Sequence, residues 1–558
     1  MSPVALAPDL PPPSSRSRSP QRSPLVAKHS ICRSETVAGR VLAFWTVQSQ
    51  SRRAAATAAL LVAASLVLRI AFVRVGFVNV DEAAHLLGAS EVLRGGDLYL
   101  RFADNKPPLI HLFYALAQCV FGEGVFSVRM AAAIVLLPLT ALGLAAYHGY
   151  RMPGLAAALA FLVASTALLP SDAHAVHCEH VMLLPLAWSI VLVRSPEARG
   201  RPARLLGVGL LTGVAFLGKQ PAALCLVAHA LAVLYRYPTE PKGARRHLRT
   251  AALWAALAAG FALPVIAAAA WFASNGALKD AVFWVWSYNL RHIDNPMSAA
   301  DTAQRVAKMG ALVLPAALPL TFAAWRASAR AVNPNTERLA WLFAWATLLP
   351  AFLGLRLFGH YFLPFLLVVA LFSGPFFVER SSSRARTGVI AFGLTAHLLF
   401  TLVGRAVHQP GSGLADVSNP AYERIASAVR AGSDGSEGTL FVWGYAPQIY
   451  VASGRRPASR FVVPVDTLTG YLAGNDTFEQ GNIDTTDRIE RTHWALLLAD
   501  LRQSKPEYIV DTAPADLNHW GRFPVDRFPD LLLFLRAEYT PHVTVDGAVI
   551  YRRVGNGG

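Results

Sequence analysis

The sequence predicts a mainly α-helical, polytopic transmembrane bundle followed by a small α/β domain. The bundle is predicted by composition: 54% of the 558 residues are hydrophobic and only 15% are charged, whereas about a quarter of a typical soluble chain is charged. A change of composition near residue 405, from apolar runs to β-branched and aromatic segments broken by Gly, Pro and Asp, predicts the separate domain.

About eleven apolar segments could cross a bilayer, which takes roughly 17 to 25 residues, or fewer inside a bundle. They lie at 54–76, 126–148, 154–170, 181–193, 204–218, 221–235, 251–273, 309–325, 339–357, 360–378 and 387–404. The stretch 204–235 is ambiguous, because it could form one broken span instead of two short ones. Residues 54–404 are therefore the predicted transmembrane domain.

Basic residues set the expected orientation of the chain. Lys and Arg gather in every second connector, for example 194–204, 236–249 and 379–386, and such connectors are cytoplasmic. The loops at 77–125, 171–180 and 274–308 then face outward together with the C-terminal domain, and the N-terminus is cytoplasmic. We expect a multi-pass protein of a bacterial inner membrane. The net charge of +16 reflects this topology, and nucleic-acid binding is excluded.

The two ends of the chain differ in character. Residues 1–53, which include "PPPSSRSRSPQRSP", are rich in Pro, Ser and Arg and predict a disordered basic tail. The first apolar run begins too deep for a signal peptide, so it is a retained anchor. Residues 405–558 predict an extracytoplasmic domain, for which an architectural lid is favoured over a sugar-binding module. The cysteines show no metal-type spacing, and a single bridge between Cys119 and Cys178 stays open.

The first outer loop, 77–125, has an unusual order of elements. "VNVDEAAHLL" places Asp81 and Glu82 directly after the first span. The next residues have the spacing of an amphipathic helix that stops at Gly95 and Gly96. An extended stretch containing "DNKPPL" and a second apolar helix follow. Ionisable groups at a membrane boundary are functional by default, although a simple charged boundary is the alternative.

This order resembles the GT-C glycosyltransferases, specifically the protein O-mannosyltransferase-like group (family 39) and the related aminoarabinose transferase. "LGKQPA" (217–222), "GHYFLPFLLVVALFSG" (359–374) and "VWGYAPQIYVASGRRPASRF" (442–461) extend the resemblance over residues 54–465. It implies a GT-C fold and transfer of a sugar from a polyprenyl-phosphate donor to a hydroxyl acceptor at the outer face, with inversion. The acceptor is an envelope glycan, a lipid or a protein.

The resemblance also implies roles for single residues. Asp81 matches the general base that takes the acceptor proton, and Glu82 would hold the acceptor or a cation. Lys106 matches the position that contacts the donor phosphate, whose developing negative charge needs fixed cations. Lys219 and Arg356 are further candidates for this phosphate clamp.

A second acidic position and a substrate cleft complete the expected site. Either Asp172 or Glu179 fits the second acidic site of the fold. The remaining candidates for the cleft are His174, His177, Arg291, His292, His360 and Tyr361. His174, His177, Cys178 and His180 have helical spacings that could suit zinc, but a polar loop is favoured, and no metal site is assigned. No cofactor is required on this interpretation, with Mg²⁺ or Mn²⁺ possible as a divalent cation.

Two other classes of protein are alternatives. A secondary transporter places ionisable groups near the bilayer midplane in two similar halves, whereas here the acids gather at one face and no repeat is visible. A non-catalytic envelope membrane protein would not require Asp81, Lys106 and Glu179 to converge. The membrane lipids and a lipid-linked sugar are thus the expected partners.

Overall fold

The computed structural model describes residues 37–194, 201–236, 244–294, 296–331, 334–379, 383–408, 419–432, 438–464, 466–472 and 484–554. The chain forms two compact units, 1–49 and 50–558, and the second contains the helical bundle and the C-terminal domain. Residues 1–36 of the predicted tail lie outside the described residues. Helix α1 (Val37–Val73) begins well before the predicted boundary at residue 54.

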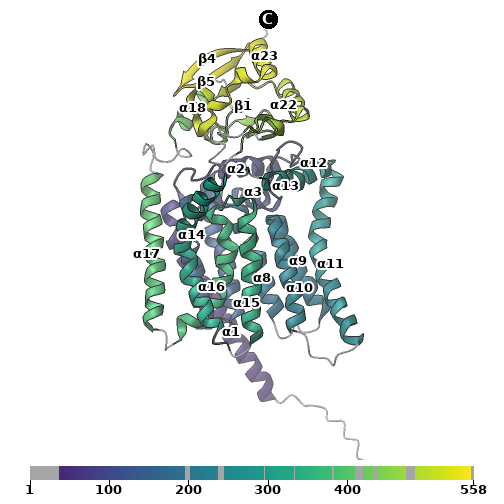
Figure 1. The fold of residues 1–558 in the computed structure, drawn as a ribbon, viewed down its shortest axis with the longest axis vertical. Coiled ribbons are helices and arrows are strands. Elements are labelled where there is room, and N and C mark those ends of the chain that lie inside the picture. The colour runs from purple at the N-terminus through teal and green to yellow at the C-terminus, as the bar shows by residue number, and fades with distance from the viewer. Residues whose placement is uncertain are drawn as a thin grey trace, which may run out of the picture. The chain divides into compact units, whose positions relative to one another are not determined.

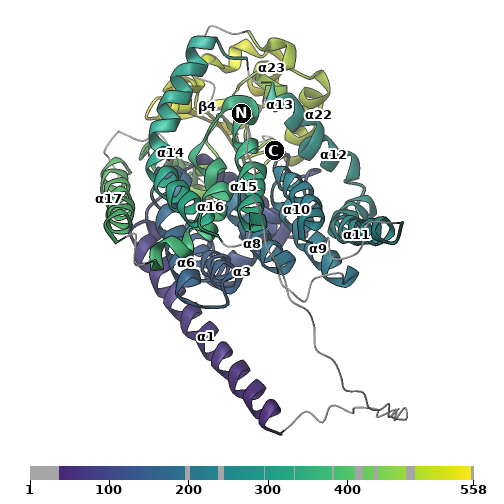
Figure 2. The same cartoon turned by 60° about the horizontal axis from the view of Figure 1, so that its bottom comes forward.

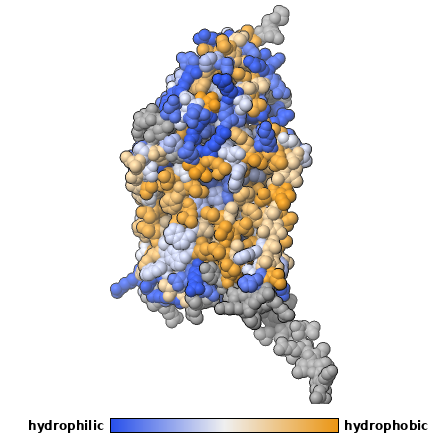
Figure 3. All heavy atoms as spheres, turned by 45° about the vertical axis from the view of Figure 1, so that its right-hand side comes forward, coloured by the Kyte–Doolittle hydropathy of each residue, from blue (hydrophilic) through white to orange (hydrophobic). Residues whose placement is uncertain are grey.

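Each of the eleven predicted spans falls on a helical segment. The helices are α1, the continuous run α4 (Val125–Ala131), η1 (Ala132–Leu136) and α5 (Leu137–Tyr147), then α6 (Met152–Ala164), α8 (Cys178–Arg194), α9 (Pro202–Gly218), α10 (Ala223–Arg236), α11 (Ala244–Ser274), α14 (Ala299–Ser328), α15 (Pro334–Leu348), α16 (Leu363–Val378) and α17 (Ser383–Val407). In the described part of the chain, 7 helical stretches are long and apolar enough to cross a membrane. They stand beneath the C-terminal domain (Figure 1), and an apolar band covers the bundle (Figure 3). The protein is an integral membrane protein.

The ambiguous stretch 204–235 forms two antiparallel helices. Leu205, near the start of α9, and Val233, near the end of α10, belong to one small apolar cluster, so the chain turns back between them through η3 (Gln220–Ala222). Helices α8, α9 and α10 lie next to one another when the lower end of the bundle comes forward (Figure 2). Helix α9 also packs tightly on α11, because a Cβ on Gly209 would lie 2.0 Å from the carbonyl oxygen of Leu257.

Short helices connect the spans at the end that faces the C-terminal domain. They are α2 (Val80–Leu93), α3 (Leu109–Phe121), α7 (Pro170–Ala173), α12 (Leu278–Val282), η4 (Phe283–Tyr288), α13 (Asn289–Ile293), η5 (Leu349–Leu355) and η6 (Gly359–Phe362). Both helices predicted in the first outer loop are present. Cys119 and Cys178 are free thiols, so the bridge between them does not form.

The C-terminal domain is a five-stranded mixed sheet with helices, as predicted. Its strands are β1 (Thr439–Trp443), β2 (Arg456–Pro457), β3 (Tyr508–Asp511), β4 (Tyr539–Val545) and β5 (Ala548–Arg553), in the order β2-β1-β3-β5-β4. Strand β1 runs parallel to β2 and β3, and β5 is antiparallel to β3 and β4. Asp546 and Gly547, both with positive φ, form the β4–β5 turn, which is the Asp-Gly chemistry that tight hairpins prefer.

The helices and short turns of this domain surround the sheet. They are α18 (Ala421–Ala431), α19 (Gln448–Ser453), α20 (Asp466–Thr469), η9 (Thr486–Arg488), α22 (Arg491–Ser504), η10 (Ala513–Ala515), η11 (Leu517–Arg522), η12 (Val525–Arg527) and α23 (Pro529–Glu538). Buried aromatic side chains fill the core, with Trp443 and Trp520 both 0% exposed and in edge-to-face contact. The same apolar cluster includes Leu87 of α2 and Trp284 of η4, so the domain packs directly on the connecting helices of the bundle.

Candidate active site

A cavity of about 540 Å³ lies between the helical bundle and the C-terminal domain. Its walls come from the 78–107, 177–179, 219–220, 284–289 and 356–361 segments and from the C-terminal domain. The lining includes predicted candidates from five separate parts of the chain: Asp81, Lys106, His177, Glu179, Lys219, Arg356, His360 and Tyr361. The fold therefore brings together most of the residues that the sequence singled out.

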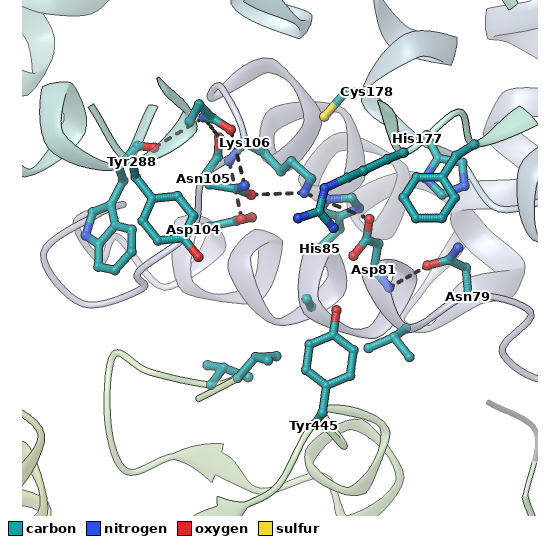
Figure 4. A pocket seen from close by; sticks show the side chains of 18 of the residues that line it. Asn79, Asp81, His85, Asp104, Asn105, Lys106, His177, Cys178, Tyr288 and Tyr445 are labelled. Carbon is teal, nitrogen blue, oxygen red and sulfur yellow. Dashed lines mark hydrogen bonds and ion pairs between the residues drawn. The ribbon is translucent and has the colours of Figure 1, made fainter. Parts of the chain in front are cut away.

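Asp81 lies in the first turn of helix α2, and Lys106 lies in the loop that follows this helix. The two side chains meet in this cavity. Lys106 Nζ lies 3.9 Å from Asp81 Oδ2, and it donates a 2.9 Å hydrogen bond to Asn105 Oδ1. Both side chains keep partial access to the cavity, with 29% of Lys106 and 33% of Asp81 exposed. Figure 4 shows the two side chains facing each other, with Tyr445 of the C-terminal domain pointing toward them.

Local backbone structure holds both groups in place. Asn79 caps helix α2, and its side-chain oxygen accepts a 2.9 Å hydrogen bond from the backbone N–H of Asp81. The Tyr99 hydroxyl donates a 2.8 Å hydrogen bond to the carbonyl oxygen of Lys106. Tyr99 itself is fully buried with φ +72. Such a strained, over-determined position is typical of functional sites.

Charges around Asp81 decide its protonation. Burial would raise the pKa of Asp81, but the surrounding positive charges, led by Lys106, together hold the pKa well below its ordinary value. Burial would lower the pKa of Lys106, but the surrounding negative charges, led by the Asp81 and Asp104 carboxylates, together keep the pKa well above normal. Asp81 is therefore ionised and Lys106 is protonated, as a pair of opposite charges.

Sequence reasoning missed a half-buried acid and two histidines beside this pair. Asp104 lines the cavity, and its Oδ2 lies 3.0 Å from Nε2 of His111. Burial would raise the pKa of Asp104, but His111, together with Lys106 and His85, lowers the pKa. His85, one turn after Asp81 on α2, also lines the cavity, and burial lowers its pKa to about 3. Asp104 stands in the "DNKPPL" stretch, two residues before Lys106, which is the signal that could have found it.

Glu179 and Lys219 form a second ion pair in the cavity wall. Glu179 lies in the first turn of α8, and the Lys219 ammonium contacts its Oε1. Lys219 ends α9 and also lies 3.9 Å above the ring of Tyr361. Of the two candidates for the second acidic position, Glu179 lines the cavity and Asp172 does not.

Asp172 lies behind the cavity wall and contacts His360, which lines the cavity. Its Oδ1 lies 2.6 Å from His360 Nδ1 and accepts a 3.1 Å hydrogen bond from the backbone N–H of His360. The His360 ring stacks on His177 at 3.8 Å and 10°, and His177 Nε2 lies 2.6 Å from the carbonyl oxygen of Ser171. Burial lowers the pKa of His177 to about 4, so its ring is neutral.

Asp172, His177 and His360 offer ligand atoms within 4.8 Å of one another, as a metal site would require. One nitrogen of each ring, however, is already engaged, by Asp172 in His360 and by a carbonyl in His177. The stacked rings also present faces to each other instead of converging lone pairs. The arrangement fits two oriented imidazole rings at the cavity wall better than a metal centre.

Four candidates do not reach the cavity. Glu82 is 2% exposed and is clamped by Arg129, whose Nε and Nη2 lie 2.8 and 2.6 Å from its two oxygens. His174 stacks on Phe72 with ring centres 4.1 Å apart. Arg291 is 57% exposed and pairs with Glu490. The fourth, Asp172, contacts His360 behind the wall, as described above.

His292 lies in α13, and its side chain is outside the described residues. The four residues of the disfavoured zinc alternative, His174, His177, Cys178 and His180, do not come together in the cavity either. The ring of His180 instead accepts a 3.2 Å hydrogen bond from the backbone N–H of His177, and only His177 and Cys178 of the four line the cavity.

The C-terminal domain is more than a lid, because it supplies part of the cavity wall. Its lining residues are Tyr445, Val462, Val463, Pro464, Asp466, Tyr471, Asn518 and His519. Tyr445 stands in the "VWGYAPQIY" motif, but the others carry no local signal. They reach the site because the C-terminal domain packs on the bundle, which lies far away in the sequence.

Comparison with known proteins agrees with this architecture. Residues 105–272 match the family model described as dolichyl-phosphate-mannose-protein mannosyltransferase. Over 150 residues the chain is 33% identical to the undecaprenyl phosphate-α-4-amino-4-deoxy-L-arabinose arabinosyl transferase of Pseudomonas aeruginosa strain LESB58, a match that covers 25% of this chain and 27% of that protein. The same protein of strain PAO1 matches to the same extent. The chain thus spans about a quarter of the length of the curated relatives it matches.

Solved structures extend the likeness to nearly the whole chain. ArnT from Cupriavidus metallidurans bound to undecaprenyl phosphate superposes with a TM-score of 0.53 at 13% identity, over 89% of this chain and 98% of that one. Its apo state gives a TM-score of 0.53 at 14% identity, over 89% and 97%. The fold is therefore that of a GT-C glycosyltransferase. Within that class, the resemblance to the aminoarabinose transferase and O-mannosyltransferase type is confirmed.

Proposed function

We propose that the protein transfers a sugar from a polyprenyl-phosphate donor to a hydroxyl acceptor at the outer face of a bacterial inner membrane, with inversion. The observation that carries the proposal is the meeting of Asp81 and Lys106 at 3.9 Å in a cavity above the bundle. A base and a fixed cation side by side are what such a transfer needs at its two reacting oxygens. The fold and the matched segment support the same class of reaction.

A second cavity of about 290 Å³ favours a lipid-linked donor. It runs into the bundle and shares Glu179, Lys219 and Arg356 with the first cavity. Its other walls are largely apolar, for example Met182, Phe216, Leu290 and Pro364. A polyprenyl chain would lie against these walls, and its phosphate would lie where the two cavities join, beside Lys219 and Arg356. ArnT from Cupriavidus metallidurans was solved with undecaprenyl phosphate bound, which supports this donor class.

The chemical step follows from the charges. The Asp81 carboxylate takes the proton of the acceptor hydroxyl while its oxygen forms a bond to the anomeric carbon. The bond between that carbon and the phosphate oxygen breaks on the opposite side, and the electron pair leaves with the lipid phosphate. Lys106, Lys219 and Arg356 stabilise the departing anion.

Donor binding would also activate the base. In the resting site Lys106 makes Asp81 a weak base, because it holds the pKa of that carboxylate well below normal. A phosphate that binds Lys106 neutralises this charge and raises the proton affinity of Asp81. Proton abstraction is thereby favoured only when the donor is in place.

The proposal needs no metal and no organic cofactor. Two of the acids that line the cavity, Asp81 and Glu179, each face a lysine. The acceptor is an envelope glycan, a lipid or a protein, and its hydroxyl is the only chemical feature that the mechanism requires.

The test uses the purified protein in lipid nanodiscs, undecaprenyl-phosphate-linked sugars with a radiolabel, and membranes of a strain that lacks the gene as acceptor. Asp81→Asn keeps the shape of the side chain and should lower kcat by about 10²- to 10⁴-fold, the usual contribution of a general base. Asp97→Asn is the matched control, because Asp97 lies in the same outer loop but does not line the cavity. Transfer by Asp81→Asn at the wild-type rate would refute the mechanism. Solute uptake into vesicles without consumption of sugar would favour a transporter.

A further inference from the structure

We propose that the C-terminal domain adds a carbohydrate subsite to the roof of the cavity, in which Asp466 accepts hydrogen bonds from sugar hydroxyl groups. The turn at 516–519 closes the same subsite. The inference rests on the proposed glycosyltransferase function and says which part of the substrate this domain recognises. The hydroxyl groups belong to a sugar ring, either that of the donor or that of the acceptor.

Asp466 is a buried carboxylate with an unmet hydrogen-bonding capacity. It begins α20, lines the cavity and is only 4% exposed. Its Oδ2 lies 3.7 Å from Arg488 Nη1, and the carboxylate also accepts hydrogen bonds from the Tyr288 hydroxyl and from the backbone N–H of Thr467. Its Oδ1 is buried and has no hydrogen-bond partner among the residues that the structure describes. Because a buried acceptor without a donor is costly, a hydroxyl donor from a ligand is the natural partner.

The neighbouring turn is held in an unfavourable conformation. Asp516, Asn518 and His519 all have left-handed backbone angles, with φ of 48°, 53° and 59°, and none of them is glycine. Side-chain bonds hold the turn in place: Asn518 Nδ2 donates to the carbonyl oxygen of Tyr445 at 2.6 Å, and Asp516 Oδ1 accepts from the N–H of Gly521 at 2.8 Å. Asn518 and His519 line the cavity. Backbone strain kept at a cavity wall indicates a function for that wall.

The negative charge of Asp466 determines which kind of ligand the C-terminal wall of the cavity can bind. Lys106 and Lys219 line the opposite part of the cavity and suit a phosphate, whereas the Asp466 carboxylate repels a phosphate and suits hydrogen-bond donors. The rings of Tyr445 and Tyr471 lie beside each other at 5.2 Å in the same wall. Aromatic faces next to a few fixed polar groups are what a compact polyhydroxylated ring requires.

The experiment compares the binding of two lipids to the full-length protein in nanodiscs. One is undecaprenyl phosphate, and the other is the undecaprenyl-phosphate-linked hexose or aminopentose that the wild type binds most tightly. If the donor sugar occupies the subsite, Asp466→Asn should bind the sugar-linked lipid about tenfold more weakly or worse, the usual effect of losing a charged hydrogen bond. Its affinity for undecaprenyl phosphate should be unchanged.

If the acceptor sugar occupies the subsite, both lipids bind Asp466→Asn as they bind the wild type. The KM for acceptor membranes from a strain that lacks the gene should then rise about tenfold at unchanged kcat. Both results support a carbohydrate subsite and assign its occupant.

Two further variants distinguish a loss of binding from misfolding of the domain. Asp511→Asn changes a carboxylate of the same domain that is also 4% exposed but does not line the cavity, and it should leave both affinities and the KM unchanged. Asn518→Gly removes the side chain but tolerates the left-handed angle, and it should weaken the same step as Asp466→Asn.

The proposal is overturned if Asp466→Asn and Asn518→Gly both keep the sugar-lipid affinity and the acceptor KM within about twofold of wild type. A different result, in which the wild type binds neither lipid and transfers no sugar, would refute the proposed function itself.

Discussion

The buried pair of Glu82 and Arg129 offers a sharp test of how the site is supported. Arg129 donates to both oxygens of Glu82 and also to the carbonyl oxygens of Phe72, Val75 and Gly76, at 2.7, 2.8 and 3.1 Å. It therefore ties the end of α1 to the start of α2, where Asp81 stands. Arg129→Met removes all of these bonds and leaves the Glu82 carboxylate buried without its partner charge.

Breaking a buried ion pair from one side costs about 3–5 kcal/mol, because an uncompensated charge stays buried. We expect Arg129→Met to lose about this much free energy of unfolding. The double variant Arg129→Met with Glu82→Leu should recover a large part of it, because both charges are then absent.

The assay is denaturant unfolding in mixed micelles, followed by tryptophan fluorescence, with sugar transfer measured on the folded fraction. A loss below about 1 kcal/mol in Arg129→Met, or a double variant no more stable than the single one, would contradict the reasoning. Glu82→Gln separates the structural role from a catalytic one. On the structural interpretation it lowers stability, and transfer per folded molecule falls far less than with Asp81→Asn.

Two more predictions concern pH and helix packing. Since Lys106 lowers the pKa of Asp81 and the base acts only when deprotonated, kcat/KM of the wild type should show no acid limb from Asp81 above about pH 5. Lys106→Met should move that limb upward by about one to three pH units, because the Coulomb energy of the pair is roughly 1–4 kcal/mol at 3.9 Å. Lys106→Arg keeps the charge and should leave the limb in place. A limb that does not move in Lys106→Met would count against the pairing. Gly209→Ala should cost about 1–3 kcal/mol in the same unfolding assay, because its Cβ would meet the carbonyl oxygen of Leu257 at 2.0 Å. Gly310→Ala in α14 has open space and should be neutral or stabilising, so equal losses in the two variants would argue against close packing of α9 on α11.

Much of the site could be predicted because a membrane requires apolar spans and polar connectors, which can be recognised in the sequence. Hydropathy places the spans and basic connectors set their direction, so acids and lysines far apart in sequence are assigned to one face before any folding is known. This is why Asp81, Lys106, Glu179 and Lys219 were all expected near one cavity. The pair of helices in 204–235 could not be resolved in this way, because a broken apolar run has the same composition whether it turns back or continues.

Side-chain direction was beyond the reach of sequence patterns. Asp81 and Glu82 are neighbours with the same charge, but successive residues of a helix point about 100° apart. One carboxylate therefore faces Lys106 in the cavity, and the other faces Arg129 in the bundle. Asp172 and Glu179 lie on different helices, α7 and α8, and one contacts His360 behind the wall whereas the other meets Lys219 within it.

The amino-acid sequence by itself determined the membrane-spanning class, the α/β domain at the end of the chain, and the motif order that marked Asp81 and Lys106. Those features depend on composition and local spacing, which need no knowledge of long-range contacts. Only the tertiary structure decided that Glu82 is a structural residue and that Asp466 and Asn518 of the C-terminal domain complete the cavity. Their roles depend on which surfaces meet across several hundred residues, and that is fixed by packing of the whole fold.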